Sequence, residues 1–525
     1  MNHPLSLSLT RTYVESYFAF TKQLLNRHRI STAVALAVVG LCISFSNLAK
    51  GPRNTRHIPR VDFIKYVRSI LAKKSREQIA REVNLPTILA SETGLYMGYD
   101  QNQWCLHIAM PKHVKHVLMN QELFPKGDGI TTRKNTLLGR FAFGPNLVTL
   151  EGDKWKQHRM IANPAFRRSM PVGMFGNLCE KLFSVMGAND TKDFRGLTER
   201  FALDAIGCGG FGFDFNAVLD KNSPWVVKYL DIISSAFDPF FLVFSFFDKR
   251  LRFLFPSRVR AHEQLSEFLL KMREIIDYKR RTLETSRDTI KDTEKDLLML
   301  MIEAEKDGEA ALTDDELMSN LCVFFIAGHD TTANSMACAA YYLARNPEIQ
   351  AKAREEVIRI LGDEPNHIFP SIEQTRQMHY ITMIIKETLR LNPPLPNASF
   401  RVAARDTEID GVFIPKGTRI QVDIYESQHN PRVWQEPEVF RPERFAADDE
   451  ADHIEGFGWT PFGNGTRQCI GMNFSLTEQR VFLSMLLRKY ELSLPKDTIH
   501  ADGIVTHGMP VSAPLNMQIT YKSRY

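Results

Sequence analysis

Cys469 lies in the segment Phe462-Gly-Asn-Gly-Thr-Arg-Gln-Cys-Ile-Gly471, which constrains this chain more than any other stretch. The glycines at 463 and 465 let the backbone turn tightly beneath a flat ligand, and the last glycine lets the following helix begin close to that ligand. We expect this helix from about Ile470 through Leu487, with its N-terminal N–H groups facing the sulfur and favouring the thiolate. A cysteine so placed is either a metal ligand or a small buried side chain of the core.

Two charged motifs precede this loop in the chain. The stretch from Met378 to Leu391 is expected to form a helix, and the three-residue spacing of Glu387 and Arg390 places opposite charges on one of its faces. Phe440-Arg-Pro-Glu-Arg-Phe445 follows it. Each motif alone is typical of a solvated surface, so the inference depends on finding them in this order before the cysteine loop.

Together these segments resemble the cytochrome P-450 family of haem-thiolate monooxygenases. The family's loop, Phe-x-x-Gly-x-Arg-x-Cys-x-Gly, is matched at every fixed position, by Phe462, Gly465, Arg467, Cys469 and Gly471. The resemblance implies that the cofactor is haem b and that all five residues contribute to its site. Cys469 would be the axial ligand of the haem iron, and the guanidinium of Arg467 would pair with a haem propionate.

The resemblance also gives meaning to the other motifs. It implies a buried network that fixes the loop under the haem, formed by Glu387, Arg390 and Arg444. It implies further propionate contacts from a Trp-x-x-x-Arg helix and from a strand, at Trp155, Arg159 and Arg401.

A long helix is expected from 314 to 345. Thr313 and Glu316 form a capping box at its start, and Leu312 with Leu317 forms a hydrophobic staple. Asn346-Pro347 then caps and begins the next helix, which ends before Gly362.

Ala327-Gly-His-Asp-Thr-Thr332 lies near the middle of the long helix. A glycine inside a helix costs about 1 kcal/mol relative to alanine, so Gly328 indicates a need for space or a bend. The resemblance implies that dioxygen binds in this space and that Asp330 and Thr331 deliver protons during its activation. From the residues alone, both side chains could simply bond to the backbone. Candidates for an apolar substrate pocket are Phe324, Phe325, Ala327, Thr332, Leu395 and Met509.

The motifs run from Trp155 to Gly471 of 525 residues, and no cut between them leaves a complete site on either side. We therefore expect one haem-containing catalytic domain at 61–525, mainly α with a small β region. The net charge of +5 comes without a dense basic tract, so no nucleic-acid partner is indicated. Seven cysteines without paired spacing favour a reducing compartment over a disulfide framework or a zinc site.

Residues 30–49 contain no charged side chain and are about long enough to span a membrane, although several Ser and Thr residues weaken the pattern. We expect an N-terminal segment at 1–29, a transmembrane anchor at 30–49 and a linker at 50–60, with a buried helix or a peripheral contact as the alternative. The chain is most similar to membrane-bound eukaryotic members of fungal-like type. This resemblance implies attachment to the endoplasmic reticulum membrane, with the catalytic domain facing the cytosol.

Two other segments carry expectations of their own. Residues 236–256 contain eight phenylalanines and are either core or a part that dips into membrane lipid beside the substrate entrance. Asp448-Asp-Glu-Ala-Asp452 is expected to be a solvated surface loop.

The resemblance implies a monooxygenase that inserts one oxygen atom of O2 into a lipophilic small molecule, such as a steroid, fatty acid, terpene or xenobiotic. The chain has no flavin or nicotinamide fingerprint, so electrons are expected from NADPH through a separate flavoprotein reductase. Candidate contributors to a cationic docking face are Lys154, Lys156, Arg167, Arg168, Arg488 and Lys489. Two alternatives stay open: a reductase-independent haem-thiolate isomerase or dehydratase, which would not need the Asp330-Thr331 pair, and a non-catalytic haem or lipid binder.

Overall fold

The computed structural model describes residue 46 and residues 48–525, except 101–102, 128–134, 169, 287–289, 291–294, 307–311, 366–367, 399 and 508–510. Within this part the chain is mainly helical, as expected from the sequence. The α-helices are α2 (Phe63–Leu71), α3 (Arg76–Ile79), α4 (Leu85–Ala90), α5 (Pro111–Met119), α6 (Leu137–Ala142), α7 (Gly152–Arg168), α8 (Val172–Met186), α9 (Phe194–Ile206), α10 (Pro224–Ala236), α11 (Pro239–Val243), α12 (Ser245–Arg250), α13 (Pro256–Ser286), α14 (Leu297–Lys306), α15 (Asp314–Arg345), α16 (Pro347–Leu361), α17 (Ile372–Gln377), α18 (His379–Leu391), α19 (Ile424–Gln428), α20 (Glu450–His453) and α21 (Met472–Lys489). Short 3₁₀ or π turns are η1 (Arg53–Thr55), η2 (Ala80–Asn84), η4 (Gly207–Phe211), η5 (Arg252–Leu254), η7 (Pro442–Phe445) and η8 (Gly465–Arg467).

The strands form small sheets. They are β1 (Leu95–Asp100), β2 (Gln103–Ile108), β3 (Asn189–Asp193), β4 (Arg401–Val402), β5 (Thr407–Ile409), β6 (Val412–Ile414), β7 (Arg419–Val422), β8 (Tyr490–Ser493), β9 (Thr506–His507), β10 (Ala513–Pro514) and β11 (Gln518–Ser523). In the described part, one sheet has the order β1-β2-β7-β4 and another the order β3-β11-β8, while β5 pairs with β6 and β9 with β10. The hairpin predicted around Leu95 and Trp104 is confirmed, with Leu95 opposite Ile108 in antiparallel register.

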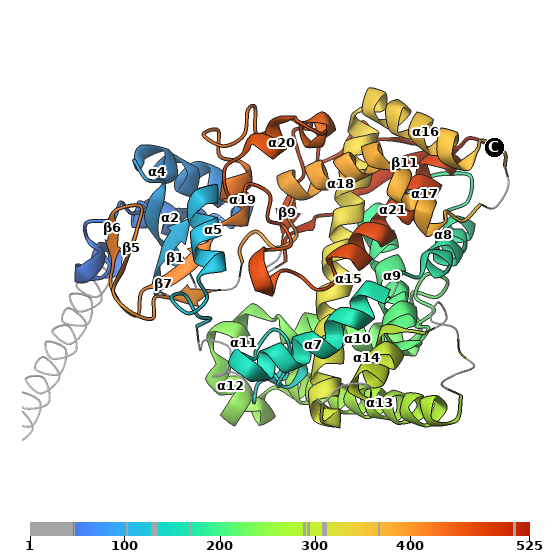
Figure 1. Ribbon diagram of the computed structural model, residues 1–525, viewed down its shortest axis with the longest axis horizontal. Helices are drawn as coiled ribbons and strands as arrows, with labels where there is room; N and C mark the ends of the chain where they lie inside the picture. Colours follow the sequence, from blue (N-terminus) through green and yellow to red (C-terminus); the bar gives the residue numbers. More distant parts are fainter. Residues whose placement is uncertain are drawn as a thin grey trace, which may run out of the picture.

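Most of the helices lie at one end of the molecule, and the largest sheet lies at the other end together with α2, α4 and α5 (Figure 1). The main hydrophobic core lies among the helices from α6 to α21, and a second core lies between the β1-β2-β7-β4 sheet and the elements that cover it. Helix α15 runs through the helical part and contacts α9, α13, α18 and α21. Residues from distant parts of the chain therefore converge on the middle of α15.

The expected start of α15 is confirmed. Thr313 accepts a hydrogen bond from the Glu316 backbone N–H, and the Glu316 side chain accepts one from the Thr313 backbone N–H. Leu312 and Leu317 are both buried beside this turn, as a hydrophobic staple requires. The helix ends at Arg345, where the sequence placed its end.

The next helix, α16, also has the expected bounds, with Pro347 first and Gly362 after its end at a φ of +80°. The expected cap is wrong, however, because the Asn346 side chain donates back to the Tyr342 carbonyl oxygen at 2.8 Å and makes no capping bond to α16. Proline supplies this helix start without a side-chain cap, since its missing N–H needs no partner at the first position.

The expected membrane anchor at 30–49 lies almost entirely outside the described residues. In the part of the chain that the structure describes, no helix has both the length and the apolar character needed to cross a membrane.

Candidate active site

The loop before α21 holds Cys469 in a tight backbone turn. The Cys469 N–H donates to the Phe462 carbonyl oxygen at 2.9 Å, which closes the loop. Gly465 has a φ of +71°, and a Cβ there would lie 3.1 Å from the Leu118 carbonyl oxygen, so this position requires glycine both for its conformation and for the close approach of α5. The following helix begins at Met472, two residues later than the sequence suggested.

The Cys469 sulfur faces the N-terminus of α21. The backbone N–H groups of Gly471 and Met472 and the Arg159 guanidinium lie near enough to the sulfur to affect its pKa. These three groups lower the pKa of the thiol, but burial has the larger effect and raises that pKa above its ordinary value. Cys469 is accessible to solvent, although enough protein lies around the sulfur for burial to dominate its pKa. A helix N-terminus and a nearby cation both favour the thiolate form, which is the form that binds a metal ion.

Three cations lie close together beside this loop. Arg467 in η8, Arg401 at the start of β4 and Lys126 are near enough to influence one another, and Glu151 is the carboxylate that partly offsets them. Burial, followed by the charges of Arg467 and Arg401, lowers the pKa of Lys126 to about 7. Burial lowers the pKa of Arg467 to about 10, with Arg401 as the next cause. This group carries more positive charge than its surroundings neutralise.

Several donors of this group have carbonyl partners, but others do not. Arg467 donates to the Leu150 carbonyl oxygen at 2.9 Å, and the Lys126 ammonium donates to the Val148 carbonyl oxygen at 2.6 Å. Within the described residues, neither the Nε of Arg401 nor the Nε of Arg467 has a hydrogen-bond partner, although both atoms are buried. Buried donors without partners are rare in folded proteins, and here they point to an anionic ligand.

Helix α7 brings Trp155 and Arg159 to the same loop. The central carbon of the Arg467 guanidinium lies 3.8 Å from the centroid of the buried Trp155 ring. One turn later on the helix, Arg159 donates to the Gln468 carbonyl oxygen at 3.0 Å. Both residues of the Trp-x-x-x-Arg motif therefore contact the segment that holds the cysteine.

Glu387, Arg390 and Arg444 meet in a fully buried network. The Glu387 carboxylate accepts two hydrogen bonds from Arg390, at 2.7 and 2.9 Å, and one from the Nε of Arg444 at 3.0 Å. The Arg441 backbone N–H donates to the same carboxylate. Both arginines also donate to backbone carbonyls and lie over the Trp434 ring. The network thus joins α18 to η7 without leaving a buried charge unpaired.

Asp330 and Thr331 occupy the middle of α15. The Asp330 carboxylate lies 3.7 Å from the Arg195 guanidinium of α9 and 3.6 Å from the Nδ1 of His329. The Thr331 hydroxyl donates to the Ala327 carbonyl oxygen, one turn earlier in the same helix, at 2.6 Å. The two neighbouring side chains therefore have different partners: the carboxylate belongs to a charged cluster, whereas the hydroxyl bonds to the helix backbone.

Comparisons with known proteins identify this arrangement. The family model for Cytochrome P450 matches residues 92–515, which include the cysteine loop, the buried network and the middle of α15. The chain belongs to the cytochrome P450 family. It is 31% identical to cytochrome P450 3A12 of Canis lupus familiaris, covering 79% of this chain and 82% of that protein, and 31% identical to cytochrome P450 3A9 of Rattus norvegicus, covering 76% and 79%. The crystal structure of a cytochrome P450DA heme domain matches the fold with a TM-score of 0.72 at 23% identity, over 89% of this chain and 98% of that one.

This cytochrome P450 is accordingly a monooxygenase whose cofactor is haem b. Its residues fit that group: the Cys469 sulfur would bind the iron, and Arg401 and Arg467 would hold the propionates through Nε donors that have no partner among the described residues. Lys126 would add positive charge beside them. A Cβ on Gly471 would lie 3.9 Å from the sulfur, so this position lies directly beside the proposed iron ligand. The named relatives are mammalian, and the comparison does not support the fungal-like subtype expected from the sequence.

Sequence reasoning missed Lys126 as a member of this site. No local motif marks it, because its place beside Arg401 depends on an isolated antiparallel bridge between residues 275 positions apart. Its unusual pKa arises only from that tertiary packing.

Glu450 was also missed, and the expectation of a solvated loop at 448–452 is wrong for this residue. Its carboxylate pairs with Arg444 and with Arg441, and only 10% of the side chain is exposed. The short helix α20 turns Glu450 inward while the neighbouring aspartates stay toward the surface. The buried network therefore contains a second carboxylate.

The structure shows why α15 carries glycine at position 328. A Cβ at this position would lie 3.1 Å from the Cδ1 of Ile206, so the glycine lets α9 pack closely against α15. The helix shows no break there. Glycine at 328 thus provides the space that this helix contact needs, as one of the expected reasons for a glycine there.

Two of the pocket candidates pack in the core. Phe325 is fully buried and stacks on Phe211, with ring centroids 4.4 Å apart. Phe324 is nearly buried and meets Phe166 edge to face, at 5.1 Å between centroids. Phe325 therefore stabilises the contact between α15 and η4, and Phe324 stabilises the contact with α7.

The other candidates differ in their surroundings. Thr332 is buried, and its hydroxyl lies 3.0 Å from that of Ser475, so it joins α15 to α21. Ala327 and Leu395 are exposed. Met509 lies outside the described residues. Of the set, Ala327 and Leu395 are the described residues that a ligand could contact without rearrangement.

Proposed function

We propose that this cytochrome P450 inserts one oxygen atom of O2 into a lipophilic small molecule, in the class of steroids, fatty acids, terpenes or xenobiotics, and receives electrons from NADPH through a separate flavoprotein reductase. When bound, the haem supplies the centre at which dioxygen is activated. The observation that carries the proposal is the adjacency of Asp330 and Thr331 on α15, one tied to a charged cluster and the other bonded to the exposed Ala327.

In this proposal Asp330 and Thr331 pass protons inward. Asp330 is partly exposed and contacts Arg195, so it can exchange protons with groups of the α9 surface. Thr331 can rotate its hydroxyl from the Ala327 carbonyl toward a reacting oxygen atom, and in that orientation it donates a hydrogen bond. An isomerase would not use such a pair, which favours the monooxygenase over that alternative.

Membrane lipid is proposed as the surface from which the substrate arrives. The segment at 236–256 exposes several large apolar side chains, with Val243, Phe246 and Phe253 between 59% and 72% exposed, while Phe241 is buried. Helices α11 and α12 thus present an apolar surface that suits insertion into lipid, one of the two alternatives left open by the sequence. This surface supports attachment to the endoplasmic reticulum membrane, with the catalytic domain in the cytosol.

The reductase is proposed to dock on the outer side of α7. Lys154, Lys156, Arg167 and Arg168 are all exposed on this helix, which also carries the haem-facing Trp155 and Arg159. Arg488 does not belong to the face, because it is buried and donates to the Gly362 carbonyl oxygen at 2.8 Å. Positive charge on one helix that contacts the cysteine loop supports an approach of an acidic partner from this side.

The test reconstitutes the purified chain with haem, an NADPH-dependent flavoprotein reductase and O2. The substrates are lipophilic compounds chosen because they change the haem absorbance spectrum by displacing the iron-bound water. We expect hydroxylated product from at least one compound, with one NADPH consumed for each product formed. Turnover without reductase and NADPH would support the isomerase instead. Binding without turnover under either condition would support a non-catalytic binder.

A further inference from the structure

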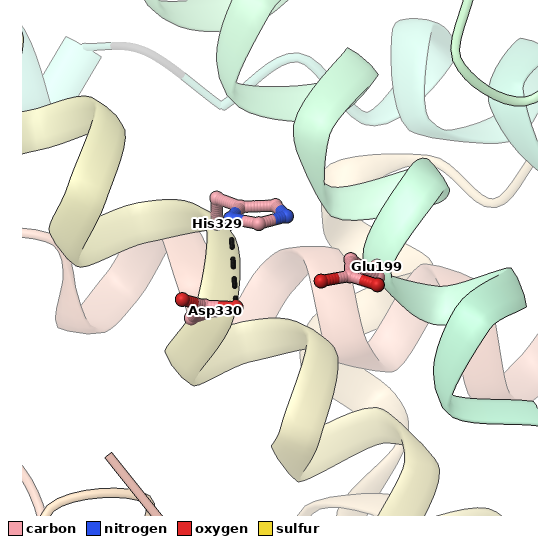
Figure 2. Close-up of side chains that lie close together, drawn as sticks. All are labelled: Glu199, His329 and Asp330. Carbon is pink, nitrogen blue, oxygen red and sulfur yellow. Dashed lines mark ion pairs between the residues drawn. The ribbon is translucent and has the colours of Figure 1, made fainter. Parts of the chain in front are cut away.

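A cluster of potential metal ligands lies between α9 and α15. Glu199 of α9 reaches toward the turn of α15 that carries His329 and Asp330 (Figure 2). One ligand atom from each of the three residues lies within 4.8 Å of the other two. Side chains from two packed helices, 130 and 131 positions apart in sequence, thus offer an imidazole and two carboxylates to one point.

His329 is the second and independent reason to consider a ligand here. The side chain is 1% exposed, and among the described residues neither ring nitrogen has a hydrogen-bond partner. Its ring packs edge to face against Tyr229, with 5.5 Å between ring centroids. This contact orients the imidazole but gives its nitrogens no hydrogen-bond partner. A buried polar group without a partner is destabilising and rare in folded proteins, so a protein that keeps one calls for an explanation such as a bound ligand.

Arg195 belongs to the same cluster and must be considered as a competitor. Its guanidinium lies 3.4 Å from the Glu199 carboxylate and 3.7 Å from that of Asp330, and its Nε donates to Asn334 at 3.2 Å. Both carboxylate distances are long for a charge-assisted hydrogen bond. One guanidinium offsets one of the two carboxylate charges, and the cluster keeps a net negative charge that attracts a further cation.

We propose that Glu199, His329 and Asp330 form a binding site for a divalent transition-metal ion, with Zn²⁺ as the best match. Zn²⁺ accepts mixed nitrogen and oxygen ligands in tetrahedral geometry, with one position left for water. Ligand distances of about 2.0–2.2 Å require the three atoms to approach by roughly one ångström, which side-chain rotation provides. Ca²⁺ and Mg²⁺ prefer oxygen ligands only and are poorly matched by the imidazole.

The site would regulate the enzyme, and this part of the inference rests on the proposed function. A metal ion on Asp330 would hold the carboxylate that the proposed function assigns to proton delivery. Zn²⁺ should therefore inhibit product formation supported by NADPH and reductase. Zn²⁺ should not inhibit product formation supported by an organic hydroperoxide. That oxidant supplies oxygen already at the reduction level of peroxide, so the reaction needs no protons from Asp330.

The binding test uses the haem-loaded enzyme and Zn²⁺ alone. Equilibrium dialysis followed by metal analysis should give about one bound Zn²⁺ per chain at the tightest site. Glu199→Gln and His329→Phe, each checked for folding by the ferrous carbon monoxide spectrum, should each bind at that site at least tenfold more weakly. Exposed residues provide matched controls, and Glu355→Gln and His116→Gln should leave the affinity unchanged.

The activity test measures product with and without Zn²⁺, each variant being normalised to its own metal-free rate, with cytochrome c reduction as the control for the reductase. Loss of tight binding in Glu199→Gln and His329→Phe, together with loss of inhibition, supports the proposal. Equal affinity in wild type and both variants, or no binding at all, overturns the metal site. Tight binding at these residues without inhibition would keep the metal site and instead contradict the role of Asp330 in the proposed function.

Discussion

The Arg467 guanidinium lies over the Trp155 indole, with its central carbon 3.8 Å from the ring centroid. Besides its proposed place in the haem site, the indole therefore contacts and supports the arginine of the cysteine loop. The Leu150 carbonyl oxygen fixes the guanidinium from another side, at 2.9 Å. Helix α7 and the loop thus form one unit around the proposed propionate contacts.

Trp155→Leu should accelerate haem loss several-fold, because it removes both the indole contact and the support of the guanidinium. A cation–π contact of this kind is worth about 0.5–2 kcal/mol. Trp155→Phe retains a ring beneath Arg467 and should have a smaller effect. Transfer of haem to an acceptor protein measures both rates, and equal rates in the two variants would mean that the stacking does not support the haem.

Lys126 should make haem binding depend on pH. Burial, with the charges of Arg467 and Arg401, lowers the folded-state pKa of the ammonium to about 7, below its usual 10.5. Between these two pKa values the folded chain binds fewer protons than the unfolded chain. The free-energy cost of burying the Lys126 ammonium is therefore largest below pH 7 and decreases as the pH rises. Propionates beside the ammonium would raise its pKa again, so haem binding above pH 7 takes up a proton.

The affinity for haem should consequently fall above pH 7, by up to about tenfold per pH unit. Lys126→Arg keeps the charge at all these pH values and should bind haem without this slope, whereas Lys126→Gln should bind weakly at every pH. Haem dissociation rates between pH 6 and 9 provide the measurement. A wild-type slope that persists in Lys126→Arg would assign the pH dependence to another group.

The elements predicted best from the sequence are those whose ends depend on nearby residues. Thr313 and Glu316 begin α15, and Pro347 and Gly362 bound α16, through contacts within a few positions of each residue. The cysteine loop is also local, because one hydrogen bond between Phe462 and Cys469 closes it. Such signals are fully present in the sequence.

The sequence could not predict positions that depend on distant packing. Glu450 stands in an acidic run typical of a solvated loop, and only its contact with Arg444 reveals a buried role. The reason for Gly328 lies with Ile206, more than a hundred residues earlier. The cluster around Asp330 likewise depends on where α9 packs against α15.

Glu387→Ala should give protein that does not retain haem, because it leaves Arg390 and Arg444 buried without their shared carboxylate. Breaking a buried charge network in this way costs about 3–5 kcal/mol. Glu450→Gln should cost less, since Arg444 keeps Glu387 as a partner and Glu450 is not fully buried. Urea unfolding and haem content measure both effects, and a stable, fully loaded Glu387→Ala protein would contradict the structural role of the network.

Cys469→Ser should abolish the red-shifted Soret absorbance of the ferrous carbon monoxide adduct. Serine preserves the shape of the loop, including the bond from its N–H to the Phe462 carbonyl oxygen, but it replaces the sulfur that Gly471 and Met472 face. Cys208→Ser is a suitable control, because that cysteine lies in η4 and not in the loop. Retention of the band in Cys469→Ser would assign the iron ligand to another residue.

Thr331→Ala should separate NADPH consumption from product formation. The substitution removes the hydroxyl that now donates to the Ala327 carbonyl oxygen, but it keeps the helix, because that bond lies within one turn and the backbone ladder is unchanged. Reducing power should then appear as hydrogen peroxide in place of product, since the proton is no longer delivered to the right oxygen atom. Thr331→Ser restores the hydroxyl and should restore coupling.

Asp330→Asn should instead slow turnover, because an amide cannot pass on protons as a carboxyl group does, although it can still contact Arg195. Product and peroxide formed per NADPH measure all three variants, and unchanged coupling and rate throughout would show that Asp330 and Thr331 make only local contacts in α15.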